Sequence, residues 1–175
     1  MIKKISLMDI ALIGIATALV IGMQIALSFI PNIEFVTLLF ILYTLHFKAK
    51  AIYIVYIFVL VECLIYPFGL WCIVYLYIWL ILYFLVQIFK GQTSAVLWAI
   101  VGAIFGLLFG SLSSIPYFFT MGFAGGIAHI VSGLSFDLIH CFGNFVVILV
   151  LFKPLNRVLG QLPYFALQSP DHKIT

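Results

Sequence analysis

The chain has 175 residues, of which 66% are hydrophobic and only 7% are charged, and its formal net charge is +3. A soluble domain carries about 25% charged residues, so this composition excludes a water-soluble protein. It predicts an all-α integral membrane protein with residues 1–175 in one domain, and it leaves no room for an ATPase or a soluble catalytic domain. The positive charge comes from segments that flank the apolar stretches and does not indicate a nucleic-acid partner.

Apolar segments follow one another along the chain, separated by turn residues and lysines. The first covers about 5–30 and ends at Pro31 and Asn32. It is too long for the apolar region of a cleavable signal peptide and lacks a small-residue cleavage site, so we interpret it as a helix. The second predicted helix, over about 33–47, is short for crossing about 30 Å of hydrocarbon. The remaining predicted helices cover about 33–47, 51–66, 70–89, 95–114 and 136–152.

Residues 117–135 are ambiguous, because they contain four glycines and no Asp, Glu, Lys or Arg. As a seventh membrane span, they would place Lys153 and Arg157 outside the cell, against the usual charge bias. We therefore predict a long outward loop over 117–135 that could act as a lid, and the sequence leaves open whether it is helical.

All eight Lys and Arg residues fall on one side of this six-helix pattern. By the positive-inside rule, this asymmetry predicts six transmembrane helices, three outward connections and cytoplasmic N and C termini. The eight are Lys3, Lys4, Lys48, Lys50, Lys90, Lys153, Arg157 and Lys173.

Polar residues collect on the predicted outward side. Asp137, His140 and Asn144 follow an i, i+3, i+7 spacing and therefore share one helical face. They form either a ligand site or a local hydrogen-bonded group. Glu34 could equally serve the free backbone N–H groups at the start of its helix. Glu62 has no basic partner nearby in the sequence, so it is protonated, bonded to a histidine or bonded to a ligand.

Aromatic residues crowd the same side, and Trp71, Tyr75 and Trp79 recur at four-residue spacing. Such a stripe could line a pocket for a flat ring, although interfacial belt residues explain at least one member. No catalytic motif is present, and the scatter of His, Asp and Glu makes a metal site a weak hypothesis. We predict a binding protein rather than an enzyme, with candidate ligand-binding residues Asn32, Glu34, Glu62, Tyr66, Trp71, Tyr75, His129, Asp137, His140 and Asn144.

Small residues form two ridges at four-residue spacing, where helix backbones can approach closely. The ridge in residues 95–114 is expected to pack internally. The ridge in residues 5–30 is either internal packing or a docking surface for another subunit. The first ridge comprises Gly102, Gly106, Gly110 and Ser114, and the second comprises Gly14, Ala18, Gly22 and Ala26.

Three stretches carry a resemblance to a known family: residues 31–39 (PNIEFVTLL), 66–71 (YPFGLW) and 136–144 (FDLIHCFGN). Together with the chain length and the predicted topology, they resemble substrate-binding S components of energy-coupling factor vitamin transporters, in a bacterial subfamily linked to cobalamin uptake. The resemblance covers essentially the whole chain.

The resemblance implies a protein of the bacterial cytoplasmic membrane that captures a vitamin outside and performs no chemistry. Such proteins have no cofactor of their own; they dock on a membrane coupling protein, and two ABC-type ATPases use ATP. Docking would map onto Gly14, Ala18 and Gly22, where the family has an alanine-type stripe and this chain has glycine at two of the three positions.

Charge narrows the expected ligand. The outward half carries three acidic residues and no Lys or Arg, whereas a vitamin with a carboxylate would normally need a cation. Cobalamin is the first prediction, because its primary amides donate to carboxylates and carbonyls. Thiamine, riboflavin or a pyridoxine-like vitamin comes next.

Two other classes remain as alternatives. A small membrane enzyme would use Asp137, His140 and Glu62 as acid–base groups or metal ligands and would turn over a substrate. A structural subunit of a larger membrane complex would tolerate exchange of its outer polar residues without loss of transport.

Overall fold

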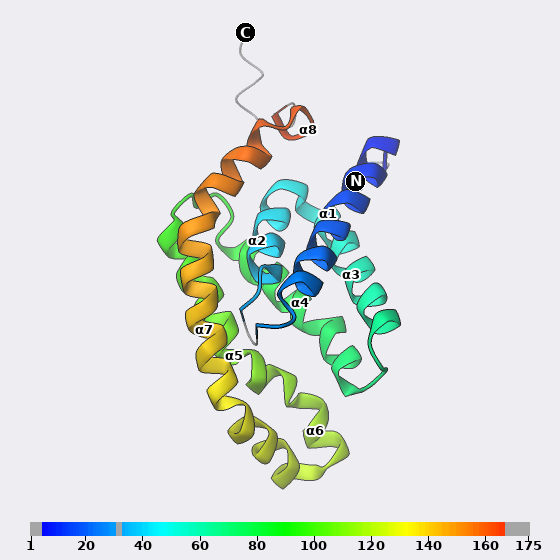
Figure 1. Cartoon of the computed structure of the whole chain (residues 1–175), viewed down its shortest axis with the longest axis vertical. Helices are drawn as coiled ribbons and strands as arrows, with labels where there is room; N and C mark the ends of the chain where they lie inside the picture. Colours follow the sequence, from blue (N-terminus) through cyan, green and yellow to red (C-terminus); the bar gives the residue numbers. More distant parts are fainter. Residues whose placement is uncertain (1–4, 31–32, 167–175) are drawn as a thin grey trace.

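The computed structural model describes residues 5–30 and 33–166, and this part of the chain is built from helices (Figure 1). The short helices η1, α6 and α8 join or extend the longer ones. In chain order the elements are α1 (Leu7–Leu27), α2 (Val36–Phe47), the 3₁₀ helix η1 (Lys48–Lys50), α3 (Ala51–Ile65), α4 (Leu70–Ile88), α5 (Ala95–Ser113), α6 (Ile115–Thr120), α7 (Gly122–Gln161) and α8 (Pro163–Ala166).

Four helical segments of the described chain are long and apolar enough to cross a membrane. They are Leu7–Leu27, Leu70–Ile88, Ala95–Thr120, which joins α5 and α6, and Gly122–Gln161. Large apolar side chains are exposed along their outer surfaces, as for Leu7 at 84% and Phe84 at 60%. Such a surface is stable in lipid and not in water, so the protein is an all-helical membrane protein.

Helix α2 is the central element of the fold. It has only 12 residues, yet nine of them are buried, and it contacts α1, α3, α4, α5 and α7. A helix that is apolar on every side belongs in the middle of a bundle. Phe40 illustrates this position, since its ring packs edge-on against Phe58 of α3 and Trp79 of α4.

The glycine ridge of α5 packs against α7, as predicted. A Cβ atom added to Gly106 would lie 2.9 Å from the backbone carbonyl of His140, and one added to Gly110 would lie 2.5 Å from the Asp137 carboxylate. Because these glycines of α5 carry no side chain, the two helix backbones can approach closely. This pair has the most extensive helix–helix contact of the described chain.

The segment 117–135, predicted as an outward loop whose helicity the sequence left open, is helical in the structure apart from Met121. Helix α6 covers its beginning, Gly122 turns the chain with a φ of +71°, and α7 then runs without a break for 40 residues. The chain does not reverse its direction between Ser135 and Phe136. The segments before and after this point therefore belong to one helix and do not form two successive membrane crossings. Four glycines and the absence of charge suggested a loop, but the same small apolar residues are compatible with a helix in lipid.

One end of the fold gathers the basic turns. Figure 1 shows the start of α1, the α2–α3 turn, the α4–α5 turn and the last part of α7 at the same end of the molecule. Here Lys50 Nζ lies 2.5 Å from the Asp9 carboxylate, and the Tyr164 hydroxyl donates to the same carboxylate. Burial lowers the pKa of Lys50, but the bonds to Asp9 and Tyr164 outweigh it and raise that pKa overall. The cluster ties α1 and α8 to the α2–α3 turn.

Candidate functional site

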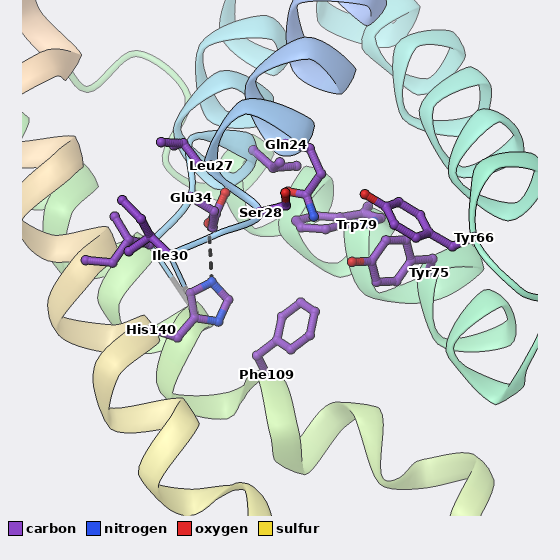
Figure 2. Close-up of a pocket in the computed structure, with 12 residues that line it drawn as sticks. Gln24, Leu27, Ser28, Ile30, Glu34, Tyr66, Tyr75, Trp79, Phe109 and His140 are labelled. Atoms are coloured by element: carbon purple, nitrogen blue, oxygen red, sulfur yellow. Dashed lines mark hydrogen bonds and ion pairs between the residues drawn. The ribbon is translucent and has the colours of Figure 1, made fainter.

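A cavity of about 330 Å³ opens where α1 ends and the chain turns toward α2. Its walls come from α1, the α1–α2 connection, the end of α3, the first half of α4, α5 and α7 (Figure 2). Residues far apart in the sequence therefore meet around one space. The lining residues are Gln24, Leu27, Ser28, Ile30, Ile33, Glu34, Val36, Tyr66, Tyr75, Trp79, Phe109 and His140.

A carboxylate–imidazole pair forms one side of the cavity. His140 Nε2 lies 3.2 Å from Glu34 Oε1, and the Thr37 backbone N–H donates to Glu34 Oε2 at 2.8 Å. Glu34 thus caps the first turn of α2 while it faces His140 of α7. Its side chain is 14% exposed, so one edge of the pair is open to the cavity.

The protonation of Glu34 follows from these partners. Burial raises the pKa of the Glu34 carboxyl, but the hydrogen bond and charge of His140, together with the bonds from Thr37, lower that pKa below its ordinary value of 4.5 overall. Glu34 is therefore ionised at neutral pH and offers the cavity a negative charge.

Aromatic rings form the wall of the cavity that faces the Glu34–His140 pair. Figure 2 shows Trp79, Tyr75 and Tyr66 across the cavity from the pair, with Phe109 between them and His140. Tyr75 and Trp79 meet edge-to-face with ring centroids 5.5 Å apart, and Phe109 meets the His140 ring at 5.1 Å. Trp79 is buried, and its indole Nε1 has no hydrogen-bond partner among the described residues. A donor left unpaired in this way is available to a ligand.

The predicted residues divide into those that line the cavity and those that do not. Glu34, Tyr66, Tyr75 and His140 line it. Trp71 stands outside it, where its indole donates to the Pro67 carbonyl at 2.9 Å and its ring packs against Tyr75. Trp71 therefore supports the aromatic wall.

Glu62 is 2% exposed on α3 and is not one of the lining residues. Its Oε1 has no hydrogen-bond partner within the described chain. Glu62 forms no ion pair with a histidine or a lysine of the described chain.

Asp137 and Asn144 lie one turn either side of His140 but point into the α5–α7 interface. Asp137 accepts a hydrogen bond of 2.9 Å from the Gly110 N–H, and the Asn144 amide donates to Thr37 Oγ1 and to the Gly102 carbonyl, each at 3.3 Å. These bonds hold α5 and α2 against α7, and neither side chain lines the cavity, although Asp137 Oδ2 and Asn144 Oδ1 have no hydrogen-bond partner among the described residues.

Two further predicted residues lie elsewhere. His129 is stacked on Tyr117 at 3.9 Å between ring centroids, in the part of α7 that contacts α6, and does not line the cavity. Asn32 falls outside the described residues.

Sequence reasoning missed Gln24, Ser28 and Phe109 as lining residues. Gln24 and Ser28 are four positions apart near the end of α1, and that spacing places them on one face of the helix. Polar side chains on one face of a membrane helix are the signal that could have identified them. Phe109 carried no such signal, because a phenylalanine in an apolar helix has many possible neighbours.

The groups that line the cavity define the ligands it could accept. No Lys or Arg lines the cavity among the described residues, and no three His, Cys, Asp or Glu side chains come together there as a metal-ligand group. One ionised carboxylate, one imidazole, an unpaired indole N–H and four aromatic rings suit a flat neutral or cationic molecule with hydrogen-bond donors. No family model, curated protein or solved structure compared with the chain matches it.

Proposed function

We propose that this protein is the substrate-binding S component of an energy-coupling factor importer. The observation that carries the proposal is a cavity in which Glu34, His140 and an aromatic wall converge and which no described Lys or Arg lines. Such a site favours a vitamin without a carboxylate, because a ligand carboxylate would meet the charge of Glu34 and find no cation except a histidine.

The size of the cavity favours the smaller vitamins within that proposal. Its volume of about 330 Å³ lies near the lower end of the roughly 300–1,000 Å³ that small-molecule sites span. A thiamine or one face of a riboflavin ring fits such a space, whereas the corrin ring of cobalamin with its nucleotide loop is far larger. We therefore place thiamine and riboflavin first as ligands, and cobalamin stays a prediction that requires the α1–α2 connection to move.

The proposal includes the topology expected of this family. Six crossings would be made by α1, α2, α3, α4, α5 and α7, with both termini and the basic turns in the cytoplasm. The cavity would then open toward the outside, because its mouth lies near the end of α1 and the α3–α4 turn rather than at the basic end. The bound vitamin would be delivered through a coupling protein driven by two ATPases.

Titration of the purified, detergent-solubilised chain with a panel of vitamins, read by calorimetry, tests the proposal. Nanomolar binding of thiamine or riboflavin, about −12 kcal/mol, is the expected result. Nanomolar binding of cobalamin would keep the class and change the ligand. No binding across the panel would contradict the proposal, and turnover of any added compound would point to a membrane enzyme instead.

The exposed face of α1 is the surface that we propose docks on the coupling protein. Gly14, Ala18 and Gly22 are exposed there, and a Cβ added to either glycine would have open space around it. We expect Ala18→Trp to abolish vitamin uptake by cells that carry the complete transporter, because the indole would hold the helices apart. Vitamin affinity of the isolated variant should be unchanged. Normal uptake would remove α1 from the docking role.

A further inference from the structure

A second cavity lies at the basic end of the fold, between the α2–α3 turn and the last turn of α4. Its volume is about 550 Å³, and none of its lining residues belongs to the first cavity. Thr44, Tyr83 and Gln87 supply hydroxyl and amide groups, Leu45 and Val86 supply an apolar wall, and Lys48 and Lys90 supply charge. Neither the vitamin site nor the docking face of α1 uses this space.

The charge of this cavity is unbalanced. Lys48 and Lys90 form no ion pair with any described residue, whereas Lys50 between them in the sequence is held by Asp9. No carboxylate lines the cavity. The other described acids are Glu34, Glu62 and Asp137, and they belong to the vitamin site, the interior of α3 and the α5–α7 interface; Asp171 is outside the described residues. Two ammonium groups beside one concave space are suited to an anion.

The backbone of Lys48 provides a second observation, independent of its charge. Its φ of +55° and ψ of −127° make it the one non-glycine residue with positive φ in the described chain. Glycine would adopt that conformation without strain. The α4–α5 turn does use glycine, Gly91, at its own positive φ of 96°. We connect this strained lysine with the cavity that it lines.

We propose that this cavity binds the phosphate group of an anionic phospholipid. The apolar surface of the chain places the protein in a bilayer, and its basic end corresponds to the leaflet where anionic lipids concentrate. Lys48 and Lys90 would neutralise the phosphodiester, Gln87 and Thr44 would bond the headgroup, and Leu45 and Val86 would contact the glycerol and the first methylenes. A free phosphate shares the charge but not the apolar part of this ligand.

Native mass spectrometry of the purified full chain in detergent tests the proposal, with phosphatidylglycerol, phosphatidylcholine and inorganic phosphate as separate probes. Phosphatidylglycerol should bind at least about tenfold more tightly than phosphatidylcholine, and inorganic phosphate should not displace it. Each basic residue beside an anionic lipid contributes roughly fivefold to affinity, so the Lys48→Gln, Lys90→Gln variant should lose about 30-fold. Equal binding of the two lipids would overturn the proposal, and displacement by inorganic phosphate would assign the site to a soluble anion.

Two matched variants complete the test. Lys153→Gln, Arg157→Gln removes the same charge from the same end of the fold, but from α7 and outside the cavity, and should lose less than about threefold. Equal losses in the two Gln variants would mean that overall charge holds the lipid and would overturn the cavity as its site. The Lys48→Arg, Lys90→Arg variant retains both charges and should retain binding, which separates a lost site from a misfolded protein; loss of lipid in it would also overturn the proposal.

Discussion

At the scale of the single residue, Glu34 combines a structural role with a position in the proposed binding site. One of its carboxylate oxygens accepts a hydrogen bond from the Thr37 N–H at the start of α2, and the other faces His140 of α7. The pair therefore links the central helix to the longest helix and leaves a charged edge in the cavity. An interaction of this kind is stronger in a half-buried site than at a surface, because less water screens it.

We expect Glu34→Gln to weaken vitamin binding by about 10- to 100-fold, since a hydrogen bond to a charged group contributes roughly 1.5–3 kcal/mol. Calorimetry of the purified variant measures the loss. His129→Gln is the matched control, because His129 stacks on Tyr117 and does not line the cavity. Equal loss in both variants, or none in Glu34→Gln, would mean that the cavity is not the vitamin site.

The pH dependence of stability should carry the signature of the same residue. The pKa of Glu34 is lowered from 4.5 in the folded protein, so its ionised form stabilises the fold fully above the unfolded pKa and this contribution is lost as the pH falls through the folded pKa. Thermal unfolding in detergent should therefore show a steeper decline below about pH 4.5 for the natural chain than for Glu34→Gln. Parallel curves would show that Glu34 does not contribute in this way.

At the scale of the element, the contact between α5 and α7 positions His140. Gly106 faces the backbone of His140 itself, while Gly110 accommodates Asp137 and Gly102 accommodates Ile148. Asn144 then fastens α7 to α2 through Thr37. Asp137 and Asn144, which the sequence analysis proposed as ligand-binding residues, thus hold the helix that carries His140 of the cavity.

Gly106→Ala should lower the thermal unfolding midpoint by several degrees. The added methyl group would lie 2.9 Å from the His140 backbone carbonyl, and overpacking of that kind costs about 1–3 kcal/mol. Gly14→Ala is the control, because nothing lies within 4 Å of its Cβ position and alanine is the better helix former. Two variants with equal midpoints would show that α5 and α7 separate freely at this contact.

At the scale of the whole molecule, the helices differ widely in length. Helix α2 has 12 residues and α3 has 15, so they rise only about 18 and 22 Å, less than the roughly 30 Å of hydrocarbon. Helix α7, with 40 residues, rises about 60 Å. The cavity with Glu34 and His140 lies where these short helices meet the turns, since Val36 at the start of α2 and Tyr66 just after α3 line it.

The proposed topology predicts which turns are reachable from outside the cell. With Cys63, Cys72 and Cys141 replaced by serine, Phe68→Cys in the α3–α4 turn should react with a membrane-impermeant maleimide in intact cells. Gln92→Cys in the α4–α5 turn should react only after the membrane is permeabilised. The reverse pattern would place the basic end outside and contradict the proposed orientation.

The sequence by itself determined α1 to α5 and their approximate ends, because apolar runs interrupted by Pro, Gly and Lys are local signals; it predicted only 136–152 of α7. It also identified the internal ridge of α5, since four-residue spacing defines one face of a helix regardless of its neighbours. It left the helicity of 117–135 open, because composition alone could not separate an apolar helix from a glycine-rich loop.

Only the tertiary structure decided which polar residues share a cavity. Asp137, His140 and Asn144 have the same helical face in the sequence, but only His140 reaches the cavity, because the packing of α5 and α2 against α7 occupies the other two. Glu34 and His140 are 106 positions apart, and no periodicity links them. Local spacing fixes where a side chain points on its own helix, whereas the neighbours that surround it are set by how the other helices pack.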